Sequence, residues 1–144
     1  MNWKTEATEK LRKYDAMCRA IQNIPEELRR LELAALSIQG CRTNISGIRG
    51  GCDREDALID NLVHRQELEN ALEQAQLWVC TTERALSALS GEEKKVLHGM
   101  LIDPQRGGIA RLCEELECEQ SSIYRKRDRA LHKFTIALYG APEA

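Results

Sequence analysis

Basic side chains gather near the end of this 144-residue chain. Between Gln120 and Tyr139 five basic residues stand against one acid, Asp128, so this stretch has a net charge of +4 (5 − 1), although the whole chain carries −2. The five are Arg125, Lys126, Arg127, Arg129 and Lys133. Guanidinium and ammonium groups at this density bind phosphate, and the charge of the contacting face matters more than the chain total. The chemistry that these residues suggest is recognition of a nucleic acid.

The cationic stretch has the periodicity of a helix from Gln120 to Leu138, followed by Gly140 at a position where glycine commonly ends a helix. The apolar residues on one side of this helix are Ile123, Ala130, Leu131, Phe134 and Leu138. A short helix is predicted before it, from Ile109 to Leu116, with Glu117-Cys118-Glu119 as the turn. Two helices joined by a turn of about three residues, the second of them cationic, are typical of a helix-turn-helix DNA-binding motif.

A further helix is predicted to begin at Ser90. Ser90 and Glu93 have the spacing of a capping box, in which each side chain accepts a hydrogen bond from the backbone N–H of the other residue. Its apolar stripe comprises Val96, Leu97, Met100 and Leu101. Asp103-Pro104 and the pair Gly107-Gly108 are expected to end this helix before the next one begins.

The first 88 residues have the pattern of two helical arms around a glycine-rich loop. The first arm runs to Gln39 and is predicted to break at Pro25, after a helix over residues 2–22. The loop, residues 40–52, contains four glycines, and the second arm, residues 53–88, contains neither Pro nor Gly. Its apolar residues at near-heptad spacing are Leu58, Leu62, Leu68, Leu72, Ala75, Val79 and Leu86. At about 1.5 Å per residue the two arms would span similar lengths, about 57 Å and about 54 Å.

These patterns predict an all-α protein. A long antiparallel, coiled-coil-like helical hairpin over residues 1–88 would be followed by a three-helix DNA-binding domain over 89–140 and a tail, 141–144. Two helices cannot cover both of their apolar edges, so we expect this arm to form a homodimer. The alternatives for the arm are a stalk that only adds solubility and a surface that docks on RNA polymerase.

Several classes of protein are disfavoured. No apolar run approaches the ~18 residues of a membrane span, and the first residues do not resemble a signal peptide, so we expect a cytoplasmic protein without a membrane partner. The six cysteines include no C-x-x-C pair and the three histidines are scattered, so no metal site is expected. Cys18, Cys80 and Cys113 fall on apolar stripes and are interpreted as buried thiols. No catalytic constellation or phosphate loop is evident, which argues against an enzyme, a cofactor or a small-molecule ligand.

The segment from Leu112 to Arg125, followed by Arg129-Ala130-Leu131-His132-Lys133-Phe134, resembles region four of bacterial sigma factors. The wider layout resembles the RinA/ArpU-type family of phage and prophage late-transcription regulators. That layout comprises a helical pair, a glycine-rich loop, a long helix, the pattern Leu-x-x-Leu-Ser-x-x-Glu at 86–93 and the sigma-like segment. The resemblance covers the chain strongly over 86–140 and only in organisation before that.

The resemblance implies which residues contact DNA. Base contacts in the major groove would come from Gln120, Ser121, Tyr124 and Arg125. Phosphate contacts would come from Ser122, Arg127, Arg129, Lys133, Arg106 and Arg111. Near Arg106 and Arg111, the pair Gly107-Gly108 is expected to leave backbone N–H groups free for phosphate. The alternative for the cationic run is an ordinary solvated helix face, and the stem of Arg127 is the one most expected to pack.

This chain departs from the sigma-like pattern in three places. Glu117 stands where glycine commonly forms the turn, so the turn must close without a residue that tolerates positive φ, or with a strained one. Cys113 replaces a small Ala between the two helices. Asp128 stands inside the cationic run and reduces its attraction for phosphate.

Three functions fit these residues and patterns. The first is a sequence-specific transcription regulator, of the phage or prophage activator type, that recruits RNA polymerase. The second is a free-standing sigma-like factor bound to core RNA polymerase, although the first 88 residues hold only Trp3, Tyr14 and Trp78 as aromatic residues for capturing melted bases. The third is a DNA-packaging or scaffold component resembling a small terminase.

Overall fold

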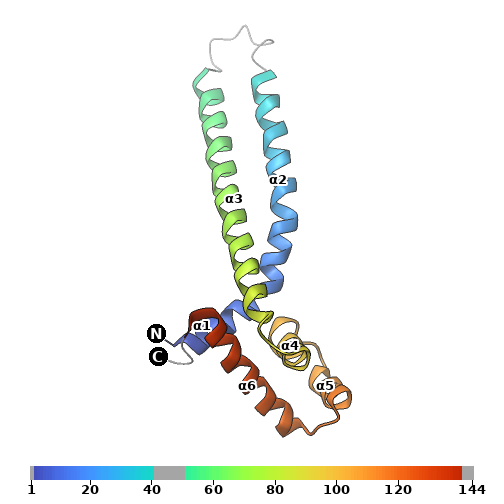
Figure 1. The fold of residues 1–144 in the computed structure, drawn as a ribbon. Coiled ribbons are helices and arrows are strands. Elements are labelled where there is room, and N and C mark those ends of the chain that lie inside the picture. Colours follow the sequence, from blue (N-terminus) through green and yellow to red (C-terminus); the bar gives the residue numbers. More distant parts are fainter. Residues whose placement is uncertain (1, 41–50, 141–144) are drawn as a thin grey trace. The chain divides into compact units, whose positions relative to one another are not determined.

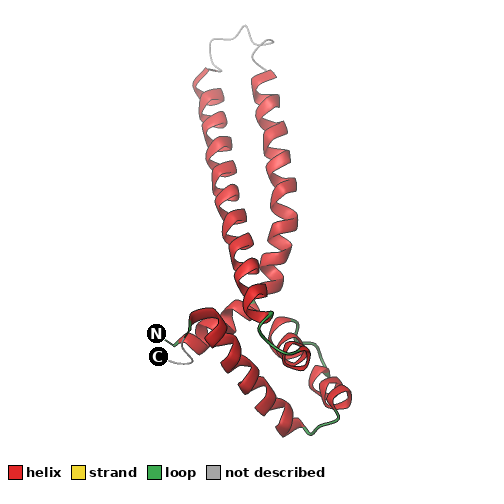
Figure 2. Ribbon diagram, in the orientation of Figure 1, coloured by secondary structure: helices red, strands yellow, loops and turns green. Residues whose placement is uncertain are grey.

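The computed structural model describes residues 2–40 and 51–140, and every element within them is a helix (Figures 1 and 2). The chain divides into two compact units. One, here called the composite unit, joins the N-terminal segment up to Cys18 with the segment from Leu77 onward, and the other, the paired-helix unit, is Arg19–Gln76. The prediction of an all-α protein is confirmed. No helix in the described part of the chain is both long enough and apolar enough to cross a membrane.

The first break in the chain lies earlier than predicted. Helix α1 is Trp3–Arg12, capped by the side chain of Asn2, and α2 is Tyr14–Gly40, so the helix expected over 2–22 ends at Lys13 instead. Lys13 is neither proline nor glycine, the two residues that most often interrupt a helix, but its ψ of −3° (with φ −89°) lies away from the helical value of about −42°. Tertiary contacts of α1, described below, override the local preference to continue the helix.

Pro25 does not end a helix, contrary to the predicted break. It lies inside α2, which continues for fifteen residues beyond it to Gly40. Proline removes one N–H from the i→i−4 ladder, and this cost is tolerated where the helix has packing on both sides of the site. Ile21 and Ile24 before it, and Leu28 and Leu31 after it, are all partly buried.

Helix α3 spans Gly51–Leu86, close to the predicted long helix over 53–88. Most of the glycine-rich loop predicted at 40–52 lies outside the described residues. Within Arg19–Gln76, α2 and α3 run antiparallel beside each other (Figure 1). Asn61, nearly buried on α3, donates a 2.8 Å hydrogen bond from Nδ2 to the carbonyl of Leu31 on α2. This bond fixes the register of the two helices at that level.

The helices after α3 follow the predicted order. They are α4 (Gly91–Leu97), a π-helical turn η2 (His98–Ile102), α5 (Gly108–Leu116) and α6 (Gln120–Tyr139). The capping box is confirmed, since Ser90 Oγ accepts from the backbone N–H of Glu93 and Glu93 Oε1 accepts from that of Ser90. The π-helical turn contains one residue more than an α-helical turn, and the adjacent residues Leu101 and Ile102 are both buried.

The hydrophobic core of the composite unit contains side chains from α1. Ala7 and Leu11 have no exposed surface and lie in one cluster with residues of α3, α4, η2 and α6. The other members are Ala85, Leu89, Leu97, Leu101, Ile102, Ala130, Leu131 and Phe134. The structure therefore divides the chain differently from the predicted boundary at 88/89, because α1 completes the core of the C-terminal helices.

Polar and aromatic contacts also hold α1 in the composite unit. The indole N–H of Trp78 donates to the carbonyl of Lys10 at 3.0 Å, in the last turn of α1, where helix carbonyls lack a partner of their own. Lys10 Nζ lies 4.4 Å from the Trp78 ring centroid, and Trp3 stacks on Tyr139 at 4.7 Å. The Tyr14 hydroxyl donates to Glu83 at 2.7 Å, and burial, followed by this carboxylate, raises the pKa of Tyr14.

Candidate nucleic-acid interface

The turn between α5 and α6 closes through a strained residue. Glu117 has φ +51° and ψ +47°, the only non-glycine residue with positive φ in the described chain. The N–H of Cys118 donates to the carbonyl of Cys113 at 3.1 Å, which is the long bond of a Schellman-type helix end. Of the two alternatives left open by the sequence, the structure has the strained residue.

Helix α6 has one buried face and one exposed face. Ile123, Ala130 and Phe134 have no exposed surface. The four residues predicted to contact bases, Gln120, Ser121, Tyr124 and Arg125, are all exposed. Ser122, predicted to contact phosphate, is partly buried. The first turn thus presents amide, hydroxyl, phenol and guanidinium groups to solvent from a helix that is anchored on its other side.

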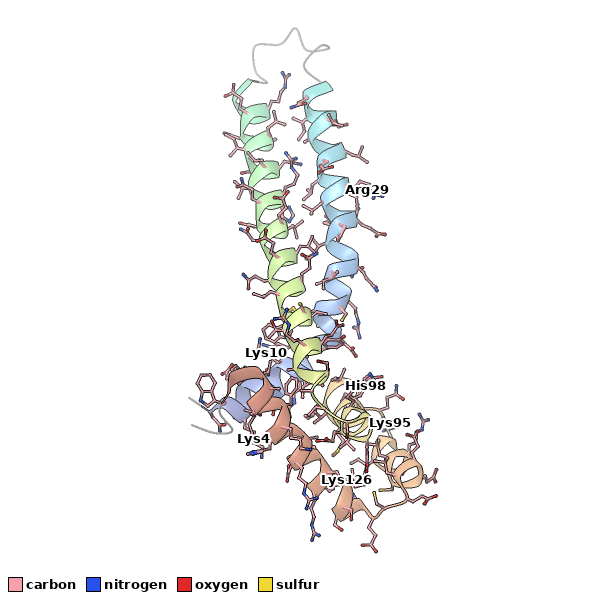
Figure 3. The ribbon with its side chains drawn as sticks, viewed as in Figure 1. Lys4, Lys10, Arg29, Lys95, His98 and Lys126 are labelled. Carbon is pink, nitrogen blue, oxygen red and sulfur yellow. The ribbon has the colours of Figure 1, made fainter. Side chains whose placement is uncertain are left out.

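The cations of α6 are not equally available. Arg125 and Arg129 are exposed, and within the described residues neither forms an ion pair. Lys133 Nζ lies 3.1 Å from Glu93 Oε1 of α4, although it was predicted to contact phosphate. Lys126, to which the sequence pattern assigned no contact, pairs with Glu92 of the same α4 turn and lies on the side of α6 facing that turn (Figure 3).

Arg127 is held on its own helix. Its guanidinium donates to Asp128 Oδ1 from Nε at 3.3 Å and from a terminal nitrogen at 3.1 Å, and its carbon Cζ lies 5.2 Å from the centroid of the Tyr124 ring. Asp128 therefore holds the Arg127 guanidinium near the exposed ring of Tyr124. It also lowers the net charge of α6. The side chain remains one-third exposed, which agrees with the expectation that its stem packs.

Glu93 is the most constrained acid of this region. Its side chain is only 18% exposed, and Oε1 accepts from both Lys133 and the Ser90 backbone. Burial favours the neutral form, but the hydrogen bonds from Lys133 and Ser90 outweigh it, so the pKa of Glu93 is lowered from 4.5. The carboxylate thus stays ionised and joins the first turn of α4 to α6.

The second predicted cationic group lies beside α5. Arg106 and Arg111 are exposed, as a phosphate contact requires. The expectation that both adjacent glycines offer free N–H groups is wrong for Gly108, whose N–H donates to the Gln105 carbonyl at 3.0 Å. Arg111 lines a shallow hollow of about 330 Å³ together with Lys95, His98, Asp103 and Glu115, among others. Acidic and basic side chains both line this hollow, so it does not concentrate positive charge for an anion.

Two sets of residues were not predicted correctly from the sequence. The sequence patterns assigned no lysine partner to Glu92 or Glu93, whereas in the structure they bind Lys126 and Lys133. Only the packing of α4 against α6 brings these side chains together, and no local pattern reports it. Cys80 is exposed rather than buried as predicted, while Cys18 and Cys113 are partly buried.

Among residues 2–40 and 51–140, no three His, Cys, Asp or Glu side chains gather as the ligands of a metal ion would. Comparisons with models of protein families, with curated proteins and with solved structures found no match to this chain. Its function must therefore be inferred from the residues of the chain itself.

Proposed function

We propose that this chain is a sequence-specific DNA-binding transcription regulator that places the first half of α6 in the major groove of duplex DNA. The observation that carries the proposal is the exposed first turn of α6, with Gln120, Ser121, Tyr124 and Arg125 on a helix whose opposite face is buried. Gln and Arg pair with the edges of adenine and guanine, respectively. A preceding short helix and a tight turn are the context in which such a helix reads bases.

Rigid support of α6 favours this function, because base recognition depends on side chains held in fixed positions. The helix contacts α1, α4 and α5, and its far end is held by the stacking of Trp3 on Tyr139. No side chain caps its N-terminus at Glu119 within the described structure, so the first backbone N–H groups remain available to a phosphate. Ser122, in this turn, would then lie close to the DNA backbone.

The charges divide into two roles under this proposal. Arg125, near the N-terminus, contacts a base, and Arg129, one turn further along, contacts phosphate. Arg106 and Arg111 add cations beside α5. Lys133 contributes to DNA binding only after its bond to Glu93 is broken, so its first role is to hold α6 on α4.

RNA polymerase enters the proposal from the resemblance to region four of sigma factors. A regulator of the phage or prophage activator type would bind an operator or promoter through α6 and recruit the polymerase through a second surface. We place this activity in the bacterial cytoplasm.

Self-association is supported by exposed apolar side chains in the paired-helix unit. Leu33 and Leu36 on α2, and Ile59, Leu62 and Val63 on α3, are each between 46% and 63% exposed. Leu36 follows Leu33 by three positions, and Leu62 and Val63 follow Ile59 by three and four, so these residues group on one side of each helix. Apolar side chains grouped in this way are typical of interaction surfaces. We assign them to a homodimer, which would bind two half-sites.

Selection of bound sequences from random duplex DNA tests the function. We expect an enriched motif with two related half-sites. On that motif Arg125→Ala should lose about 1–3 kcal/mol of binding free energy and relax the preference at one base position. The matched control is Arg29→Ala, which removes an exposed arginine from α2 (Figure 3) and should leave affinity unchanged. Absence of any enriched motif, or equal loss in both variants, would contradict the proposal.

A further inference from the structure

The first turn of α4 presents two adjacent carboxylates to α6, and each binds a lysine. Glu92 pairs with Lys126 and Glu93 with Lys133. The two lysines are seven residues apart, which is about two helical turns, so they lie on the same side of α6. These four residues line a shallow hollow of about 280 Å³ together with Ser90, Val96 and Arg129.

The two ion pairs differ in how strongly the structure fixes them. Glu93 is 18% exposed and also completes the capping box of α4. Glu92 is 48% exposed, and within the described residues Lys126 is its only bonded partner. Lys126 itself is 33% exposed. The Glu93–Lys133 pair is therefore part of the framework, whereas the Glu92–Lys126 pair can open without loss of packing.

We propose that Lys126 is a phosphate-binding residue of α6 and that Glu92 competes with DNA for it. The Glu92 carboxylate binds the Lys126 ammonium group as a phosphate oxygen would, since a carboxylate and a phosphate both offer anionic oxygens that accept from the same donor. Lys126 directly follows the exposed Arg125, so exchange of partners requires only a side-chain movement. DNA must displace Glu92, and this contact lowers the affinity for every duplex alike. The inference rests on the proposed function.

A charge-neutral replacement of Glu92 tests the competition. Affinity of the full chain for a random-sequence duplex of about 20 base pairs is measured between about 50 and 200 mM salt. Each phosphate neutralised adds about 0.9 to the slope of log affinity against log salt. We expect Glu92→Gln to bind more tightly than wild type at low salt and to lose about 3.5-fold more affinity over this fourfold range of salt concentration.

A double-mutant cycle separates competition for Lys126 from a general effect of charge. Removing any acid near DNA strengthens binding somewhat, so Glu92→Gln is compared in wild type and in the Lys126→Ala background. If Glu92 acts through Lys126, the steeper salt dependence disappears in that background. If Glu92→Gln steepens the slope equally in both backgrounds, the proposal is overturned.

Two further outcomes are decisive. If wild type binds the duplex and Glu92→Gln binds with the same affinity and slope, Lys126 is not withheld from phosphate, and the proposed function stands without this inference. If neither protein binds any duplex, the proposed function fails and the inference with it. Thermal unfolding of Glu92→Gln should match that of wild type, because the side chain is exposed. Glu93→Gln is the contrasting variant and should unfold earlier.

Discussion

The two units of the chain differ in what their helices bury. In the composite unit, helices from both ends of the sequence share a core with Phe134, Leu11, Leu97 and Ile123 fully enclosed. In the described part of Arg19–Gln76, the only buried side chains are Ala35, Asn61 and Ala75, two of them small and one polar. Large apolar residues of that unit are left exposed instead. The composite unit buries its large apolar side chains, as the core of a folded domain does. The paired helices leave theirs exposed, as a protein–protein interface does before its partner binds.

Both units contain buried polar groups. In the paired-helix unit, Asn61 satisfies its amide nitrogen on Leu31, but its Oδ1 and the nearby Nε of Arg65 are buried without a hydrogen bond. Such groups cost free energy: the oxygen lacks a donor and the Nε–H lacks an acceptor, and groups of this kind are retained in some proteins because they fix the register of helices. In the composite unit, buried Thr82 and Thr135 both donate to carbonyls one turn back, while Oε2 of Glu93 is buried without a hydrogen bond. The paired helices thus gain specificity of alignment more than stability.

The largest expected effect tests whether α1 belongs to the composite unit. Leu11→Ala removes a fully buried side chain from a core shared with α3, α4, η2 and α6, and should lower the free energy of unfolding by about 2–5 kcal/mol. The control, Leu77→Ala, changes a side chain of the same unit that is 62% exposed, and it should shift the free energy of unfolding by less than about 0.5 kcal/mol. Chemical denaturation followed by circular dichroism measures both. If Leu11→Ala leaves the free energy of unfolding unchanged, α1 does not contribute to this core, and the domain boundary predicted at 88/89 would stand.

The next effect concerns the exposed apolar face of the paired helices. Leu62→Glu puts a charge at a position that is 48% exposed, so the chain should still fold. If this face joins two copies, an interface residue of this kind contributes about 1–3 kcal/mol, and the dimer should dissociate at micromolar concentration. Sedimentation velocity of wild type and variant measures this. The control is His64→Glu, which places a new acid at an exposed polar site on the other side of α3 from Leu62. Wild type that sediments as a monomer throughout contradicts the homodimer.

Elements with strong local signals were predicted well from the sequence. Three features depend only on neighbours within four residues, and each was found where predicted. They are the capping box of Ser90 and Glu93, the start of a helix at Gln120 and the glycine that follows its end, Gly140. Glu117 was recognised as a departure from the usual glycine, but the sequence left open whether the turn would close without positive φ or through a strained residue. The exposed positions of the first turn of α6 followed from helical periodicity.

Features that depend on distant packing were predicted poorly. Pro25 is a strong local breaker, yet α2 continues through it because apolar residues pack on both sides. Lys13 carries no breaking signal, yet the helix ends there because Leu11 and Lys10 are held by residues distant in sequence, Trp78 among them. Lys133 was predicted to contact phosphate and Lys126 was assigned no contact, since nothing near them in sequence shows that α4 supplies two carboxylates.

The smallest effect comes from the charge of Glu93, and it appears as a dependence on pH. Because the folded state lowers the pKa of Glu93, its ionised form stabilises the fold fully above the ordinary value of 4.5, and this contribution is lost as the pH falls through the lowered value. Glu93→Gln keeps an acceptor for the capping box but loses the charge that attracts Lys133. At pH 7 the variant should be less stable by about 0.5–1 kcal/mol, a figure reduced for the exposure of Lys133.

As the pH falls below 4.5, the unfolding temperatures of wild type and Glu93→Gln should converge, since both then carry a neutral side chain. Glu92→Gln, on the exposed neighbour, should follow the wild-type profile at every pH. Parallel profiles of wild type and Glu93→Gln would show that the charge of Glu93 does not hold α4 on α6. Lys133 would then be free to contact phosphate from the start, as the sequence alone predicted.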